Sequence, residues 1–438
     1  MKERNKRDFE ECDLIVVGAG PAGLFCAINS CETDKRVLLL EKKQSPGRKL
    51  LVSGSGRCNL THDGDARSFL DHYGDHGRFL RPALLSFTNS DLISFFETRG
   101  LPMIRKEGGK IFPETLRSKD VLAILVEECR ARGVDLKFGR EVKSMSRSLS
   151  GSQPKSESRS HPGSRSGNED EFVVVSEDHA YRSPHLVIAT GGRSYPGTGS
   201  AGDGYRFAQS LGHKITEIGP ALTPIIIKNY PFSDLAGISF SDAEVSLHRK
   251  KKVRDMRGDV LFTHQGLSGP GILDLSRHIR AGDFLKLSFI PSRKRTELEG
   301  WLQDRTQENG ARKLKSVLLD LNLPARLMTR ILELSKIPTD LRCAHMTKKM
   351  RTLLVDNLTG FPMIVESLGS FDIAMVTRGG VDLKGINPKT MESKLAKGLY
   401  FVGEVLDVDG DCGGYNLQAA FSTGWLAAED IRESWSDL

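Results

Sequence analysis

The chain has 438 residues, of which 38% are hydrophobic and 27% charged, so it contains enough apolar material for real cores and is not disordered throughout. No stretch approaches the roughly 20 apolar residues of a membrane span. The first residues also lack the apolar core of a secretory signal, and the sequence therefore predicts a cytoplasmic protein. Seven cysteines without a CxxC pair predict neither a disulfide framework nor a metal site.

The first elements predict the start of a dinucleotide-binding fold. An apolar strand over residues 13–17 leads into the glycine-rich segment 18–23. A helix-compatible stretch follows over 22–30, and a second apolar strand over 36–40. Strand, glycine turn, helix and strand in this order are typical of a βαβ unit that binds a nucleotide.

The glycines of this turn fit the GxGxxG pattern. Gly18 permits the tight turn, Gly20 lets a pyrophosphate approach the backbone, and Gly23 lets the helix pack closely on the strand. Glu41 ends the second strand, where its carboxylate can accept hydrogen bonds from the adenosine ribose. A second GxGxxG, at residues 197–202, lacks a suitable strand before it. A separate NAD(P) domain is therefore not predicted.

Residues 144–170 are rich in serine and have no large apolar side chain after Leu149, so they cannot bury enough surface to fold. Strand-like sequence lies on each side, over 134–142 and 171–175. We therefore predict that 144–170 is the disordered tip of a long hairpin.

The later elements change character twice. Residues 184–191 look like a buried strand that runs into a glycine turn, whereas 215–290 contain short β-like runs. Residues 297–340 look helical. A strand over 398–404 and a helix over 416–429 return to the α/β pattern. The nucleotide-binding domain is therefore expected to be built from both ends of the chain.

This order predicts an α/β protein in which a β-rich unit and a helical unit are inserted into the nucleotide-binding domain. The expected boundaries are 1–212 with 368–438 for the nucleotide domain, 213–296 with 345–367 for the β-rich insert, and 297–344 for the helical insert.

The C-terminal segment favours FAD over NAD as the cofactor. Glu404, at the end of a strand, can bind ribityl hydroxyls, and a glycine-rich helix start follows at residues 410–416. The positive end of that helix can face the flavin N1/C2 carbonyl and stabilise the reduced ring.

The sequence at this point resembles the BaiN/RdsA-like (YhiN-type) family of FAD-dependent oxidoreductases. The similar segments are 47–62, 194–205, 262–270 and 389–424. The family's loop usually reads SGGGRCN, whereas this chain has Ser55 at the middle glycine. A serine there should be tolerated unless the position needs a positive φ.

The resemblance implies a glutathione-reductase-type FAD-binding Rossmann domain with an inserted β-barrel-like domain and a small helical domain. It also implies a set of FAD contacts. These predicted cofactor-binding residues are Gly18, Gly20, Pro21, Ala22, Gly23, Glu41, Lys42, Arg48, Lys49, Ser53, Gly54, Arg57, Cys58, Asn59, Val142, Thr190, Gly191, Gly403, Glu404, Gly413, Gly414, Asn416 and Leu417. Val142 would bind the adenine through its backbone.

Several of these residues have a plainer explanation. Arg48, Lys49 and Arg57 could neutralise the pyrophosphate or the flavin, or simply form a solvated basic loop. Cys58 could contact the isoalloxazine, but without a partner cysteine a small packed thiol is the better explanation.

Two residues are candidates for proton donation to a substrate reduced at flavin N5. They are His264 in FTHQGLSGP and Tyr415 in GGYN. For each, a structural hydrogen bond is the alternative. His62 replaces an asparagine that is common in the family, and neither His62 nor Cys412 is given a role.

The formal net charge of +7 and three basic runs, at 248–257, 292–295 and 347–351, raise the question of a nucleic-acid partner. Such runs make phosphate contacts in RNA-binding proteins. For any one run, ordinary surface lysines are the better explanation, and the runs together mildly favour RNA over a small-molecule substrate.

The sequence therefore predicts an FAD enzyme that transfers a hydride between flavin N5 and an organic substrate. The resemblance implies three substrate classes: uridine in ribosomal RNA, a small enone, or a small amine oxidised by O2. Reduction would need NAD(P)H as a transient donor. A non-enzymatic flavin-containing module that binds RNA or protein is the alternative, and the oligomeric state is not predicted.

Overall fold

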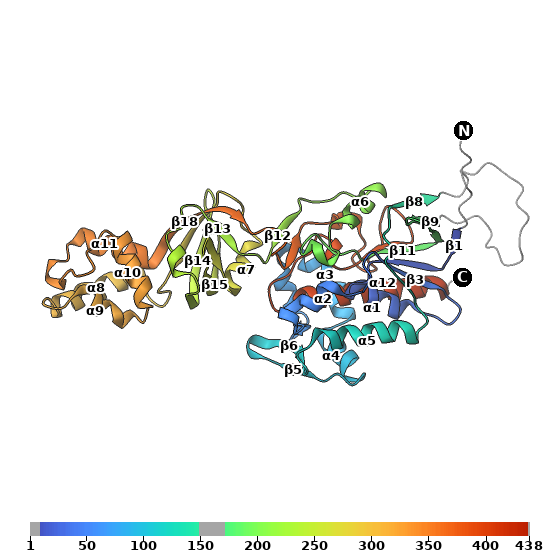
Figure 1. Cartoon of the computed structure of the whole chain (residues 1–438), viewed down its shortest axis with the longest axis horizontal. Coiled ribbons are helices and arrows are strands. Elements are labelled where there is room, and N and C mark those ends of the chain that lie inside the picture. The colour runs from blue at the N-terminus through green and yellow to red at the C-terminus, as the bar shows by residue number, and fades with distance from the viewer. Residues whose placement is uncertain (1–8, 149–170, 437–438) are drawn as a thin grey trace, which may run out of the picture. The chain divides into compact units, whose positions relative to one another are not determined.

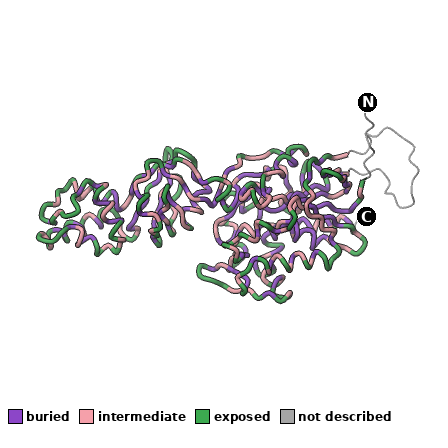
Figure 2. Tube along the Cα trace, viewed as in Figure 1, coloured by how far each residue is buried: buried purple, intermediate pink, exposed green. Residues whose placement is uncertain are grey.

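The computed structural model describes residues 9–148 and 171–436, which fall into two compact units (Figure 1). Unit 1 comprises the chain up to Gly219 and from Val376 onward, and unit 2 comprises Pro220–Met375. Each unit has its own buried apolar core, drawn in purple in Figure 2. The nucleotide domain was expected to end at residue 212 and to resume at residue 368, whereas unit 1 ends at Gly219 and resumes at Val376.

Unit 1 is built on a parallel sheet with strand order β20-β11-β2-β3-β7. Its strands are β2 (Leu14–Val17), β3 (Val37–Glu41), β7 (Asp135–Phe138), β11 (His185–Ile188) and β20 (Leu399–Phe401). All four residues of β2 are buried, as expected for a parallel sheet covered on both faces. The sheet confirms the α/β Rossmann class, and β20 supplies its edge from the far end of the chain.

Seven helices are described in unit 1. They are α1 (Pro21–Ser30), α2 (Arg48–Val52), α3 (Gly77–Ser86), α4 (Asn89–Glu97), α5 (Ser118–Ala131), α6 (Asp203–Ser210) and α12 (Tyr415–Ser436). Helices α1 and α12 pack so closely that a Cβ on Gly424 would lie 2.6 Å from the carbonyl oxygen of Ala22. The rings of Phe25 and Phe421 meet edge to face with centroids 5.2 Å apart. The two chain ends therefore share one core.

Smaller sheets complete unit 1. A four-stranded sheet joins β1 (Phe9–Glu11), β10 (Ala180–Ser183), β9 (Glu171–Val175) and β8 (Ser144–Ser148), and a three-stranded sheet joins β4 (Thr61–His62), β6 (Lys110–Pro113) and β5 (Met103–Arg105). The chain crosses between the units at β12 (Gly219–Ala221) and β19 (Val376–Arg378).

The hairpin expected around the serine-rich segment begins later than predicted. Residues 144–148 form β8, which pairs antiparallel with β9, so they are not part of a disordered tip. Strand β7 pairs instead with β3 in the central sheet. The rest of the predicted tip, residues 149–170, lies outside the described residues.

Unit 2 contains a closed six-stranded barrel and four helices beside it. The barrel strands are β13 (Ile225–Ile227), β16 (Gly266–Ser268), β15 (Lys252–Phe262), β14 (Ser239–His248), β17 (Phe284–Ser288) and β18 (Phe361–Leu368). The helices are α8 (Arg295–Glu308), α9 (Leu314–Leu318), α10 (Ala325–Leu334) and α11 (Lys348–Gly360), and the short α7 (Pro270–Ser276) follows β16.

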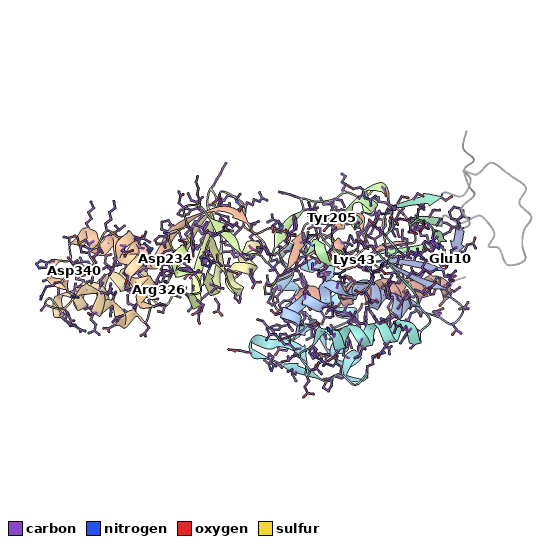
Figure 3. The ribbon with its side chains drawn as sticks, viewed as in Figure 1. Glu10, Lys43, Tyr205, Asp234, Arg326 and Asp340 are labelled. Atoms are coloured by element: carbon purple, nitrogen blue, oxygen red, sulfur yellow. The ribbon has the colours of Figure 1, made fainter. Side chains whose placement is uncertain are left out.

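The barrel and its helices share one core. Phe262 and Leu287 of the barrel belong to the same buried cluster as Leu302 and Ile331 of the helices. Arg326 of α10 donates a hydrogen bond to the carbonyl of Asp234, and both residues are labelled in Figure 3. The barrel and its helices together make up unit 2, and their division into two domains stays a prediction.

Among the described residues, no helix is long and apolar enough to cross a membrane. The same residues contain no group of three or more histidine, cysteine and acidic side chains placed to hold a metal ion.

Candidate functional site

The turn between β2 and α1 is held by close backbone packing. A Cβ on Gly18 would lie 2.5 Å from the carbonyl oxygen of Ala189, and one on Gly23 would clash with the carbonyl oxygen of Gly18. At Gly20 a Cβ would meet nothing within 4 Å. Helix α1 starts with Pro21, which has no N–H to leave unpaired. The turn is therefore crowded beneath and open at Gly20, where a phosphate can reach the helix N-terminus.

Glu41 is anchored at this turn by two backbone groups. One carboxylate oxygen accepts the Ala19 N–H at 2.9 Å, and the other accepts the Lys43 N–H at 2.8 Å. Lys43 is labelled in Figure 3. Each carboxylate oxygen keeps a second lone pair that could accept a ribose hydroxyl.

The predicted basic residues differ in what they contact. Lys42 forms an ion pair with Asp203 at the start of α6. Arg48 is exposed at the start of α2. Arg57 is also exposed, and its guanidinium lies 5.6 Å from the ring centre of Phe112.

Around Glu404, a half-buried cluster of polar side chains joins four segments that are distant in the sequence. Lys49 Nζ lies 2.6 Å from one Glu404 oxygen and also bonds the Ser194 hydroxyl. The other Glu404 oxygen accepts the Thr377 N–H at 2.8 Å and the Ser194 hydroxyl at 3.1 Å. The two predicted residues Lys49 and Glu404 thus meet directly. Burial, together with the nearby Glu404 charge, also raises the pKa of Tyr205 well above its usual range.

Ser194 and Thr377 were not predicted as site residues. Thr377 Oγ1 accepts the N–H groups of Arg193 and Ser194 at 2.7 and 3.0 Å. A Cβ on Gly192 would clash with the same Thr377 side chain. Ser194 lies in the segment 194–205 that resembles the family, and this resemblance could have indicated Ser194 as a site residue. Thr377 lies in no recognised motif.

The loop after α2 has an unusual run of left-handed backbone. Gly54, Ser55 and Gly56 have φ values of 56°, 59° and 83°. The middle position therefore needs a positive φ, which is the condition under which Ser55 is a strained replacement for glycine. Ser53 donates its hydroxyl to the Leu50 carbonyl at 2.7 Å.

Cys58 and Asn59 attach this loop to the interior. Cys58 is fully buried, and burial raises the pKa of its thiol to about 12, so a reactive thiolate is not available at neutral pH. With its side-chain amide turned to suit both neighbours, Asn59 donates to the Thr61 carbonyl at 3.1 Å and accepts the Gly414 N–H at 3.2 Å. Asn59 thereby joins the loop to the turn before α12.

The turn before α12 uses its own side chains. Gly403 packs against the Cβ of Ala22, so the end of β20 lies against the start of α1. Asn416 accepts the Gly410 N–H at 2.8 Å and donates to the Gly410 carbonyl at 2.9 Å. Its side chain is therefore occupied, and its backbone N–H at the helix start is what remains for a cofactor. Leu417 is half-buried.

The remaining predicted residues lie near the β11 turn or after β7. Val142 is buried, and Gly191 has a φ of 70°. The hydroxyl of Thr190 is buried without a hydrogen-bond partner among the described residues. An orphaned hydroxyl, the open space at Gly20 and the anchored Glu41 together fit an FAD molecule.

The two predicted proton donors lie in different units. His264 is exposed in the loop between β15 and β16 of unit 2. Tyr415 is the first residue of α12 in unit 1 and is 4% exposed. Its ring lies between two histidines: His72 stacks on it with centroids 4.0 Å apart, and His62 with centroids 5.2 Å apart.

Comparisons with known proteins identify the family. A model of the HI0933-like protein Rossmann domain matches residues 12–430. The chain is 31% identical over 425 residues to a ribosomal RNA dihydrouridine synthase of Escherichia coli, covering 96% of this chain and 98% of the relative. It is 29% identical over 426 residues to a 3-dehydro-bile acid delta(4,6)-reductase of Clostridium scindens, covering 95% and 98%.

Among solved structures, 3-ketosteroid delta1-dehydrogenase from Sterolibacterium denitrificans has a TM-score of 0.50 at 13% identity. The match covers 97% of this chain and 100% of that one, and it shows the fold alone.

The fold and the family match define an FAD-dependent oxidoreductase. Within that class, the chain belongs to the HI0933-like family, which confirms the resemblance to the BaiN/RdsA-like group.

Proposed function

We propose that the enzyme uses NAD(P)H to reduce a carbon–carbon double bond conjugated to a carbonyl, and that the substrate is uridine in ribosomal RNA. The observation that carries this proposal is the 31% identity, over 96% of the chain, to a protein named ribosomal RNA dihydrouridine synthase. Dihydrouridine is uridine with two hydrogens added across one ring double bond, so the reaction is a hydride and a proton transfer.

The cofactor contacts support a flavin reaction in unit 1. FAD, when bound, supplies the hydride at N5. Gly18, Gly20 and Gly23 would hold the pyrophosphate, and Glu41 would orient the ribose. The backbone N–H groups at the start of α12 would offer positive charge to the flavin. Lys49 neutralises Glu404, so the cluster around Glu404 presents hydroxyls and amides rather than a bare charge.

The hairpin of β14 and β15 is the surface that supports an RNA substrate. Within the basic run 248–257, Arg249, Lys252 and Arg257 each pair with an aspartate. Lys250 and Lys251, at the turn of the hairpin, are exposed and have no acidic partner among the described residues. Unpaired ammonium groups at the tip of a hairpin suit phosphate contacts.

The first experiment is an anaerobic visible spectrum of the purified protein during NADPH addition. We expect a flavin band that bleaches, and then recovers when ribosomal RNA containing unmodified uridine is added. Dihydrouridine in the recovered RNA is the product to be measured. A flavin band that NADPH and NADH both leave unchanged would contradict the proposed donor.

The RNA surface is tested by charge reversal. The double variant Lys250→Glu/Lys251→Glu should weaken RNA binding by about 10-fold or more, because two phosphate contacts are lost. The matched control is Lys394→Glu/Lys397→Glu, which makes the same charge change at two exposed lysines outside the three basic runs. Equal losses from both variants would mean that net charge, and not the hairpin, governs binding.

The second candidate is reduction of a small enone. The 29% identity, over 95% of the chain, to a protein named as a bile acid reductase favours it. A 4-ene-3-ketosteroid should then reoxidise the reduced flavin as fast in Lys250→Glu/Lys251→Glu as in the unmodified protein. An RNA enzyme should instead lose its turnover of RNA in that variant.

A further inference from the structure

Tyr415 is held in a pocket made by the glycines of its own turn. A Cβ on Gly413 would lie 2.8 Å from the Tyr415 ring, and one on Gly410 would lie 3.1 Å from the Tyr415 Cβ. The hydroxyl of Tyr73 donates to the Tyr415 carbonyl at 2.7 Å. The turn therefore leaves room for this ring and fixes its backbone.

His72 connects Tyr415 to a carboxylate. His72 belongs to the 3-10 segment η2 (Ser68–His76), and its Nε2 lies 3.0 Å from the Tyr415 hydroxyl oxygen. Its other ring nitrogen, Nδ1, lies 3.0 Å from Asp411 Oδ2. A carboxylate at Nδ1 holds the proton there in the neutral ring, which leaves Nε2 as the atom that exchanges a proton with the tyrosine.

The three side chains also differ in their exposure to solvent. The side chain of His72 is 37% exposed and that of Asp411 is 22% exposed. Tyr415 is 4% exposed. A proton can thus enter from water at His72 and reach a buried hydroxyl without crossing apolar protein.

His62 closes the other face of the Tyr415 ring. Its Nε2 is 2.6 Å from the Gly108 carbonyl oxygen, and its Nδ1 is 3.1 Å from Asp63 Oδ1. Both ring nitrogens are therefore engaged away from the Tyr415 hydroxyl. His62 positions the ring, and His72 is the histidine that can exchange a proton with it.

We propose that Asp411, His72 and Tyr415 form a proton-delivery relay for the substrate. Tyr415 is the catalytic residue, and His72 and Asp411 are positioning residues that act through it. This inference rests on the proposed function, in which one carbon of the double bond receives a hydride. Tyr415 Oη gives its proton to the neighbouring carbon. Water then protonates Nε2 of neutral His72, and the resulting imidazolium passes that proton to the Tyr415 oxygen, which leaves His72 neutral again. The substrate thereby gains two electrons and two protons from NAD(P)H and solvent together.

The relay is tested first without substrate or turnover. The two ring nitrogens of His72 are followed by nitrogen NMR in full-length protein with labelled histidine, and His72→Gln assigns the signals. Asp411 and Tyr415 are among the groups that face His72. Asp411→Asn should shift the Nδ1 signal and raise the share of the tautomer with its proton on Nε2, because the carboxylate that holds the proton on Nδ1 is removed. Tyr415→Phe should shift the Nε2 signal and leave the Nδ1 signal in place, because it removes the hydroxyl partner of Nε2 alone.

A matched control uses the same substitution elsewhere. Tyr181→Phe removes a buried phenol from β10 and should leave both His72 nitrogen signals unchanged. An Nε2 signal that is identical in the unmodified protein and in Tyr415→Phe would overturn the relay.

Turnover then separates the two transfers. In Tyr415→Phe, flavin reduction by NAD(P)H should keep its rate, whereas flavin reoxidation by substrate should slow about 100-fold, the usual worth of a general acid. His72→Gln should slow reoxidation less, and added imidazole should restore part of the rate. Unchanged reoxidation in Tyr415→Phe would also overturn the relay. If the unmodified protein reduces neither RNA nor an enone, the proposed function fails, and the His72 nitrogen signals still decide whether the three groups are coupled.

Discussion

Two glycine-rich turns in unit 1 look alike in sequence and differ in what their glycines do. Before α1, the open glycine Gly20 leaves empty space, since a Cβ there meets nothing within 4 Å. Before α12, Gly413 and Gly414 leave no space, since a Cβ would meet the Tyr415 ring or the Thr61 backbone. The first turn makes room for a ligand, and the second makes room for the protein's own aromatic and polar side chains.

The largest expected effect comes from filling the second turn. Gly414→Ala places a Cβ 2.5 Å from the Thr61 carbonyl oxygen at a φ of 98°. We expect the free energy of unfolding to fall by about 3 kcal/mol or more, because neither backbone can move freely. Urea denaturation measures this loss. Gly197→Ala, where a Cβ meets nothing within 4 Å, is the control and should stay within about 0.5 kcal/mol. A Gly414→Ala protein as stable as this control would break the comparison.

Filling the first turn should affect the cofactor and spare the fold. Gly20→Ala meets no protein atom, and Gly20 has an ordinary φ of −81°. We expect the dissociation constant for FAD to rise about 10-fold or more, which is about 1.4 kcal/mol, because the new methyl group stands where the pyrophosphate approaches. Fluorescence titration of the apoprotein with FAD measures it. Undiminished FAD affinity would show that the open side of the turn faces something other than the cofactor.

The loop that Asn59 attaches to the second turn offers a stabilising change. Ser55 has a φ of 59°, and its two neighbours are glycines with positive φ. Ser55→Gly should raise the free energy of unfolding by about 1 kcal/mol, because the left-handed conformation costs a residue with a Cβ about that much. Thermal denaturation of the holoenzyme tests this expectation. A lower melting temperature would mean that the serine hydroxyl makes a contact worth more than the strain.

The smallest effect concerns the segment that leads into the second turn. Burial raises the pKa of Asp407 above its usual value, while the nearby His76 charge partly opposes this. The folded state therefore holds its proton to higher pH than the unfolded chain does. Stability should consequently fall as the pH rises through the interval between the ordinary and the raised pKa.

Asp407→Asn should remove that fall, with a gain of about 0.5 kcal/mol at neutral pH, since water still screens part of the group. Unfolding free energies from about pH 4 to about pH 8 would reveal it. Asp178→Asn, at an exposed carboxylate, should leave the profile unchanged. A profile for Asp407→Asn that parallels that of the unmodified protein would contradict the expected sign.

The sequence was most informative where the signal is local. Three glycines after a strand, with Glu41 at the end of the next strand, predict the first turn because all of its contacts lie within one βαβ unit. The cluster around Glu404 could not be predicted in the same way. Lys49 and Glu404 are 355 positions apart, and Thr377 belongs to no motif.

The proposed role of His72 could not be predicted from the sequence either, because its partner Asp411 lies 339 positions further along the chain. Strand β8 shows a different kind of failure. Its sequence SMSRS looks disordered by composition, yet Met145 is buried and pairs with Val174 of β9. One apolar residue with polar neighbours on each side was the available sign of a strand.

The division of unit 1 between the two chain ends has a consequence for biosynthesis. The chain emerges from the ribosome N-terminus first, so α1 is made long before β20 and α12, which complete the same sheet and core. Unit 2 is continuous in sequence and is finished while unit 1 still lacks its edge strand. At about 5–20 residues per second, the interval between the end of unit 2 and the synthesis of β20 lasts several seconds. Limited proteolysis of ribosome-bound chains should therefore find unit 2 protected first. Unit 1 should stay sensitive to protease until β20 and α12 are made, unless a chaperone or free cofactor protects it.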